Sequence, residues 1–142
     1  MSHQFVNSLP FHLNRVGVKL ADLFGERLAE HAITVPMYRA LAVLHQEGPK
    51  TLTELSQLTN VELSTLSRLV GGLVKRGLIL RTRIEENGRI VRIELTEDGE
   101  DLTAKLMPIA IEYEQIATQG IEEHEITEVK RLLILIYQNL NA

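Results

Sequence analysis

The chain has no cysteine and no tryptophan, and only 4% of its 142 residues are aromatic. Without cysteine the protein can form no disulfide bond and carry out no thiol-based chemistry, which fits a cytosolic chain. No run of 18 apolar residues is present, so we expect no membrane-spanning helix. Residues 1–4 show neither the basic region nor the hydrophobic core of a signal peptide. We therefore expect one cytoplasmic domain, large enough for its own hydrophobic core.

Catalytic motifs are also missing. The sequence contains no glycine-rich phosphate loop, no Gly-x-Ser-x-Gly and no carboxylate pair that can be assigned to a cleft. The five histidines have no metal-ligand spacing: His3, His12, His31, His45 and His124. The acidic run at Glu122, Glu123 and Glu125 can be interpreted as a metal cluster or as a solvated helix start, where carboxylates favour the helix dipole. We expect no enzymatic activity, no cofactor and no metal.

The net charge of −4 conceals an uneven distribution. Residues 1–49 contain 4 basic and 4 acidic side chains, residues 50–93 contain 8 basic and 4 acidic, and residues 94–142 contain 3 basic and 11 acidic. The central segment therefore has a net charge of +4, and the last third has −8. A polyanionic partner is expected to meet the central segment and to avoid the last third.

Residues 51–77 have the pattern of two short helices joined by a turn. Thr51 and Glu54 have capping-box spacing at the start of the first helix, although Thr53 is an equally suitable cap. In the second helix, apolar side chains recur at three- and four-residue steps: Leu66, Leu69, Leu73 and Val74. The other face of this helix is polar or basic: Ser64, Thr65, Ser67, Arg68 and Lys75. Gly77 follows as a C-terminal glycine.

Hydroxyl groups and an arginine at the front of such a helix suit the major groove of DNA. Arginine can bind guanine through two hydrogen bonds, and hydroxyls can reach base edges or phosphates. An ordinary solvated helix face has the same composition, so the pattern alone does not decide between the two.

A predicted hairpin follows the second helix. Two alternating runs, residues 78–84 and 90–95, flank Asn87-Gly88, the strongest two-residue hairpin signal. The ribbon carries four arginines: Arg81, Arg83, Arg89 and Arg92. A basic ribbon beside a helix–turn–helix favours a polyanion-binding module over a generic surface hairpin.

These residues resemble the MarR family of bacterial transcriptional regulators over about residues 10–140. The resemblance rests on the run from Leu73 to Arg81 that contains Lys75-Arg76-Gly77-Leu78-Ile79, on an arginine at the wing tip, and on Leu95-Thr96 followed by Gly99. Residues 33–41 are similar to the family's second helix. The family implies a winged helix–turn–helix that binds double-stranded DNA as an intertwined homodimer.

Two departures from the family pattern stand out. The family usually has aspartate two residues before the wing-tip arginine, where this chain has Asn87, which brings no charge to orient Arg89. Gly71-Gly72 lies inside the second helix, where each glycine costs ~1 kcal/mol relative to alanine. Close packing against a neighbouring element or a deformable helix end would explain the glycine pair.

Further helices are predicted over residues 8–31, 36–46, 96–119 and 123–141, with Pro108 kinking the third. The last of them is apolar nearly all round, so we expect it to pack against a second copy of the chain. The predicted fold is mainly α (α+β), a single domain over 1–142. Its DNA-binding lobe occupies about 34–95, and its dimerisation helices about 5–31 and 96–141.

The resemblance also implies a small aromatic or anionic effector between the lobe and the dimerisation helices. By position, the lining residues are Phe11, His12, Arg15, Met37, Tyr38 and Arg39. An arginine beside apolar and aromatic groups suits an amphipathic anion. Salt bridges at the dimer junction would explain Arg15 and Arg39 equally well.

We therefore predict a ligand-responsive repressor that binds a pseudo-palindromic operator as a homodimer. The predicted DNA contacts are Thr53, Ser64, Thr65, Ser67, Arg68 and Lys75 on the helices, and Arg81, Arg83, Arg89 and Arg92 on the wing. Two alternatives stay open. One is a winged-helix protein-interaction module, favoured by Asn87 and the acidic last third, and the other is a constitutive regulator without an effector.

Overall fold

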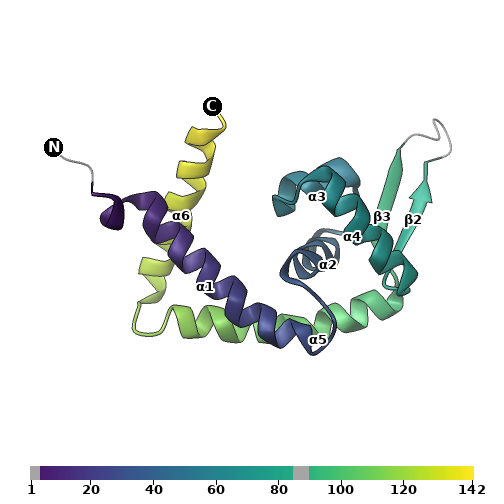
Figure 1. Cartoon of the computed structure of the whole chain (residues 1–142), viewed down its shortest axis with the longest axis horizontal. Helices are drawn as coiled ribbons and strands as arrows, with labels where there is room; N and C mark the ends of the chain where they lie inside the picture. The colour runs from purple at the N-terminus through teal and green to yellow at the C-terminus, as the bar shows by residue number, and fades with distance from the viewer. Residues whose placement is uncertain (1–3, 85–89) are drawn as a thin grey trace.

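The computed structural model of the chain describes residues 4–84 and 90–142. The elements follow in the order η1 (Phe5–Asn7), α1 (Leu9–Ala29), α2 (Val35–Glu47), β1 (Lys50–Thr51), α3 (Leu52–Thr59), α4 (Leu63–Lys75), β2 (Ile79–Arg83), β3 (Val91–Leu95), α5 (Glu97–Ala117) and α6 (Glu123–Leu140). Helices α2–α4 and the strands form a lobe at one end, and both termini lie at the other (Figure 1). This is the predicted mainly α fold with a winged helix–turn–helix lobe.

Short polar side chains begin four of the helices. Ser8, Thr34, Thr51 and Thr96 each accept a hydrogen bond from the backbone N–H three residues ahead. At α3 the capping is reciprocal, because the Glu54 N–H donates to Thr51 Oγ1 at 3.2 Å and the Thr51 N–H donates to Glu54 Oε1 at 3.0 Å. The predicted capping box is confirmed, and Thr51 rather than Thr53 is the cap.

The sheet has three antiparallel strands in the order β1-β3-β2, one more than the predicted ribbon. Strand β1 consists of Lys50 and Thr51 alone, which pair with Ile93 and Arg92 of β3. Two residues are too few to show the alternation that marks a strand, so the sequence pattern could not reveal β1. Through this pairing, the residues just before α3 are attached to the wing.

The hydrophobic core lies inside the lobe and extends to α1 and α5. On α4 the buried side chains are Leu66, Val70 and Leu73, while Leu69 and Val74 are only partly buried against the same core. The predicted apolar face is therefore correct for Leu66 and Leu73, but it is centred on Val70. The other buried apolar residues are Leu28, Ile33, Ala40, Leu41, Leu44, Leu55, Val61, Leu78, Ile79, Ile93 and Leu106.

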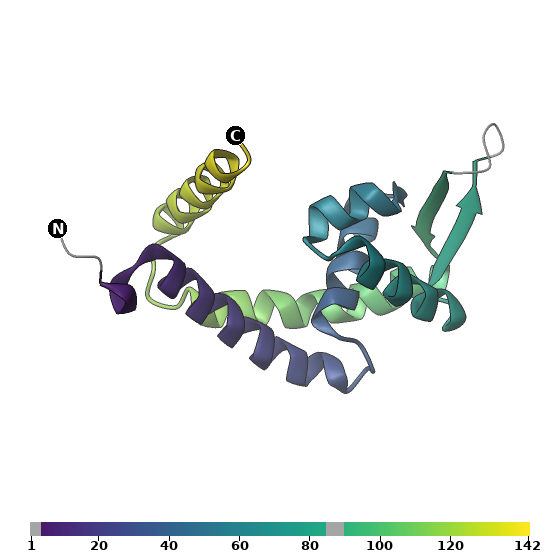
Figure 2. The ribbon, with the colours of Figure 1, turned by 45° about the horizontal axis from the view of Figure 1, so that its top comes forward.

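Helices α1, α5 and α6 form a helical arm that leads away from the lobe. Helix α5 is continuous through Pro108, and Gly120 follows it with a φ of 81°. Helix α6 has no buried residue along its 18 positions, and it stands clear of the lobe in both views (Figures 1 and 2). None of the helices within residues 4–84 and 90–142 is long and apolar enough to cross a membrane.

Candidate nucleic-acid interface

Helix α4 presents the polar face that was predicted from the sequence. The exposed side chains on it are Ser64, Thr65, Ser67, Arg68 and Lys75. The turn before α4 is fixed by Asn60, which adopts a left-handed conformation with a φ of 55°, and by the Ser56 hydroxyl, which donates to the Val61 carbonyl at 2.6 Å. A recognition helix needs such an outer face projecting from a fixed turn.

Arg81 of β2 links the wing to α4. Its Nη2 donates to the Ser67 carbonyl oxygen at 3.2 Å, and a Cβ on Gly71 would lie 3.4 Å from the same nitrogen. This is an ordinary van der Waals distance to the end of a flexible side chain, so an alanine at position 71 would fit. A Cβ on Gly72 would meet nothing within 4 Å, so close packing accounts for neither glycine.

The arginines of the ribbon do not share one surface. In the β2–β3 register, Arg81 is opposite Ile93 and Thr82 is opposite Arg92. Directly paired residues point to the same side of an antiparallel sheet, and successive residues point to opposite sides. Arg81, and Arg83 two residues later, therefore lie on the side of the buried Ile93, whereas Arg92 lies on the other side.

Arg92 is instead near the start of α3. The pKa of Glu54 is lowered, first by hydrogen bonds with Thr51 and then by the positive charges of Lys50 and Arg92. Thr53 is exposed in this first turn of α3. Among the described residues, the predicted DNA contacts thus fall into two groups. One consists of the α4 side chains with Arg81 and Arg83 on the same side of the ribbon, and the other of Thr53 and Arg92 at the start of α3.

The predicted wing tip, residues 85–89, lies outside the described residues. Arg89 and Asn87 belong to it, and His3 falls in the other segment outside them. Wing docking by Arg89 therefore stays a prediction.

Sequence reasoning missed the role of Arg76. Its Nη1 donates to the Ala32 carbonyl at 2.6 Å and its Nη2 to the His31 carbonyl at 3.1 Å. One residue later, the Gly77 carbonyl accepts a hydrogen bond from Thr96 Oγ1 at 2.6 Å. The end of α4 is thus attached both to the α1–α2 turn and to the start of α5. No sequence signal separates an arginine with this role from the arginines that face DNA.

Within one chain, the six predicted effector-lining residues are divided between different parts of the structure. His12 and Arg15 line a hollow of about 720 Å³ between α1 and α5. Tyr38 and Arg39 line a separate hollow of about 480 Å³ between α2 and α3. Phe11 lies in neither, and its ring is 5.3 Å from the Arg15 guanidinium carbon. Met37 likewise lies in neither and packs against the core. A single effector site lined by all six residues therefore stays a prediction, and within one chain these residues are divided between two hollows and the core.

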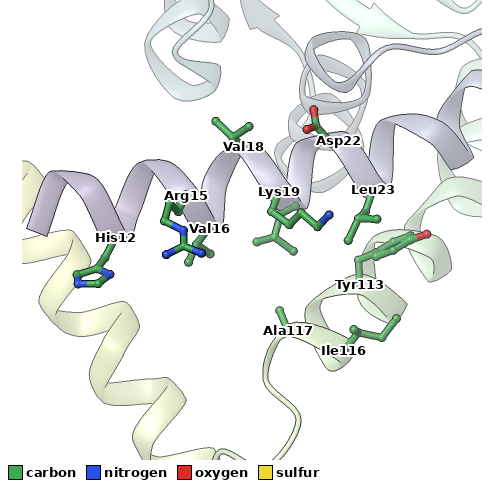
Figure 3. A pocket seen from close by; sticks show the side chains of 11 residues that line it. His12, Arg15, Val16, Val18, Lys19, Asp22, Leu23, Tyr113, Ile116 and Ala117 are labelled. Carbon is green, nitrogen blue, oxygen red and sulfur yellow. The ribbon is translucent and has the colours of Figure 1, made fainter. Parts of the chain in front are cut away.

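The larger hollow has an amphipathic lining. Figure 3 shows Arg15 and Lys19 of α1 on the side that faces Tyr113 and Ile116 of α5. The sequence could not assign Tyr113 to this site, because its position depends on how α1 and α5 pack. The cations beside apolar walls suit a small amphipathic anion.

The acidic run before α6 forms a helix cap. The Glu122 N–H donates to Glu125 Oε1 at 3.1 Å, and His124 Nδ1 lies 3.2 Å from Glu122 Oε2. These side chains are exposed. Of the two interpretations of this run, the structure supports the solvated helix start.

Comparison with known proteins identifies similarity to transcriptional regulators. A family model described as the MarR family matches residues 33–91. The chain is 32% identical over 103 residues to the organic hydroperoxide resistance transcriptional regulator of Bacillus subtilis, covering 72% of this chain and 70% of that protein. It is 26% identical over 134 residues to the HTH-type transcriptional repressor IacR of Pseudomonas putida, covering 94% and 80% respectively. The fold matches that of BpsR from Bordetella bronchiseptica with a TM-score of 0.87 at 20% identity, over 96% of this chain and 98% of that one.

Proposed function

The chain belongs to the MarR family of transcriptional regulators, and from this premise we propose that it is a homodimeric, ligand-responsive repressor of a pseudo-palindromic operator. Membership makes it a DNA-binding regulator rather than an enzyme. Repression is supported by the similarity to IacR, a transcriptional repressor. Because a bacterial regulator acts on the chromosome, we also propose a cytoplasmic location.

One observation carries the DNA-binding proposal. The exposed polar face of α4 lies in the basic segment of an otherwise acidic chain. In the proposed complex, Ser64, Thr65, Ser67 and Arg68 contact bases or nearby phosphates in the major groove, and Lys75 and Thr53 contact phosphates. The wing arginines Arg81, Arg83, Arg89 and Arg92 hold the minor groove or the backbone. Arg92 lies on the side of the ribbon opposite to Arg81 and close to α3. This position supports contacts between Arg92 and the DNA backbone.

The dimer proposal rests on α6. Its side chains Leu132, Leu135 and Tyr137 are 41%, 44% and 53% exposed, and an ion pair links the helix to α5, with Lys130 Nζ 3.0 Å from Glu114 Oε1. An apolar helix left this exposed is an interaction surface. We propose that a second copy covers it, which places two recognition helices on one duplex. They can enter successive major grooves when they are about 34 Å apart.

The effector proposal rests on the α1–α5 hollow. DNA binding of BpsR is regulated by 6-hydroxynicotinic acid, and the hollow here combines Arg15 with apolar walls. We propose that a small aromatic acid binds there and selects a dimer whose lobes are wrongly spaced for the operator. Calorimetric titration with aromatic carboxylates should detect binding to the wild type and not to Arg15→Ala.

Salt-dependent binding to a random-sequence duplex tests the central proposal. When the cations of a regulator neutralise DNA phosphates, the logarithm of its affinity falls linearly with the logarithm of the salt concentration. Arg89→Ala should weaken binding to all sequences and reduce the slope by about 1. Arg68→Ala should also change sequence preference, at a cost of ~1–3 kcal/mol for a bidentate base contact. Lys105→Ala, exposed on α5, is the matched control. If neither arginine matters, or the wild type shows no salt-dependent affinity, the protein is better explained as an interaction module.

A further inference from the structure

The first residue of the recognition helix, Leu63, is an exposed leucine. Its exposed fraction is 47%, whereas Leu66, three residues later, is fully buried. Spacing of three would normally continue the buried face of the helix. Leu63 lies in the first turn of the helix, where about half of its side chain is accessible to solvent.

Its neighbours at the front of α4 are polar. The Ser64 hydroxyl donates to Glu62 Oε1 at 2.5 Å, so the proton of this predicted base contact already has an acceptor. Thr65 is exposed. Leu63 is therefore the large apolar side chain that the front of the helix offers to a partner.

The proposed dimer does not account for this exposure. Helix α4 belongs to the lobe, at the end of the molecule opposite α6 and the termini (Figure 1). The first turn of a recognition helix is the part that meets base edges. Among the groups in the major groove, the C5-methyl of thymine is the one that offers apolar contact.

We propose that Leu63 is a specificity-determining residue that contacts the C5-methyl group of a thymine in each half-site. The inference rests on the proposed DNA-binding function and deepens it, since it assigns readout of an A·T pair to an apolar contact. In the proposed complex the polar residues of α4 form hydrogen bonds with DNA. Leu63 distinguishes thymine from the other bases because it buries the thymine methyl group.

The test replaces thymine by deoxyuridine, which keeps base pairing and removes the methyl group. A duplex is first selected from a random pool by the wild-type protein and is then synthesised with deoxyuridine at each thymine in turn. Burial of one methyl group corresponds to about a fourfold affinity change. We expect a fourfold loss at one symmetry-related position per half-site, and about sixteenfold when both half-sites are changed.

Variants of Leu63 connect the methyl group to the residue. Leu63→Ala and Leu63→Ser should bind the thymine and deoxyuridine duplexes equally, whereas Leu63→Met should keep most of the discrimination. Leu58→Ala is the matched control, because Leu58 is 50% exposed on α3 and lies outside the recognition helix. It should discriminate as the wild type does.

Failure of the Leu63 contact and failure of DNA binding give different results. If the wild type selects a duplex but no thymine position is sensitive to deoxyuridine, the Leu63 inference is wrong and the DNA-binding proposal stands. The Leu63 inference is also wrong, and the DNA-binding proposal stands, if Leu63→Ala still binds the thymine duplex more tightly than the deoxyuridine duplex. If no duplex is enriched and binding is absent at low salt, the proposed function itself is wrong.

Discussion

Arg76 Nη1 donates a hydrogen bond to the carbonyl oxygen of Ala32 at 2.6 Å, across 44 positions of the sequence. The partner carbonyl belongs to the turn between α1 and α2, and Ala32 itself has a φ of 56°. The end of the recognition helix is thereby joined to the helical arm through a charged group.

Substitution of Arg76 by alanine should destabilise the fold. Hydrogen bonds to charged groups are worth ~1.5–3 kcal/mol when well buried, and because Arg76 is exposed we expect a loss of about 1–2 kcal/mol. Arg76→Lys should recover only part of this loss, since an ammonium cannot reproduce the two-pronged geometry. Urea unfolding of the three proteins measures the effect, and equal stability of wild type and Arg76→Ala would contradict it.

Gly99→Ala should disrupt the start of α5. A Cβ at this position would lie 2.1 Å from the Leu78 carbonyl oxygen, which is backbone and cannot move aside. Forced overpacking of this kind costs about 3 kcal/mol or more. Circular dichroism and thermal unfolding should show a greatly reduced transition temperature or no folded protein. A fully stable Gly99→Ala variant would mean that the start of α5 packs differently.

Gly72→Ala should have the opposite effect. This helix-interior position has open space where a Cβ would be, so alanine should stabilise α4 by about 0.5–1 kcal/mol. If thermal unfolding shows the gain while operator affinity falls, Gly72 contributes flexibility or close approach at the DNA. If both are unchanged or improved, the deformable-helix explanation of Gly72 is excluded.

Glu54 should make stability depend on pH in the acid range. Its pKa is lowered from 4.5 by hydrogen bonds with Thr51 and by Lys50 and Arg92. A carboxyl whose pKa is lower in the folded state stabilises the fold above its unfolded pKa, and this contribution disappears as the pH falls through the folded value. The stability difference between wild type and Glu54→Gln should therefore be present at pH 6 and shrink below about pH 4. A difference independent of pH would rule out a contribution from the charge.

Charge on α6 should prevent dimerisation. The double variant Leu132→Glu/Leu135→Glu places carboxylates on a surface that we propose is covered by a second copy, where unpaired buried charge is strongly unfavourable. Light scattering should give a dimer for the wild type and a monomer for the variant. Gln138→Glu/Asn139→Glu adds the same charge at polar positions of α6 and should stay dimeric. A wild type that is monomeric at micromolar concentration would contradict the dimer proposal.

Local features were predictable from the sequence, and features that depend on packing were not. The caps Ser8, Thr34, Thr51 and Thr96 act on residues three positions away, so their spacing is visible in the chain. The Arg76 contact spans 44 positions, and the α1–α5 hollow joins residues about a hundred positions apart. The way in which the helices cross determines which of these distant residues come together. The ribbon was an intermediate case: the sequence indicated its two strands, but the register that places Arg92 on the side opposite to Arg81 could be read only from the structure.

The separation of charge along the chain has a consequence for how the protein finds DNA. The basic segment lies in the lobe, and most of the acidic last third lies in α5 and α6. Glu94 lies in β3, and Glu97, Asp98, Glu100 and Asp101 lie in the first turns of α5 beside the lobe, so the excess of cations is confined to the exposed face of α4 and the ribbon arginines. In the field of a duplex, attraction of these cations and repulsion of the carboxylates favour approaches in which this face leads, so that a larger fraction of collisions is productive. Added salt weakens this orientation beyond a separation of about 10 Å, and the association rate should fall with it.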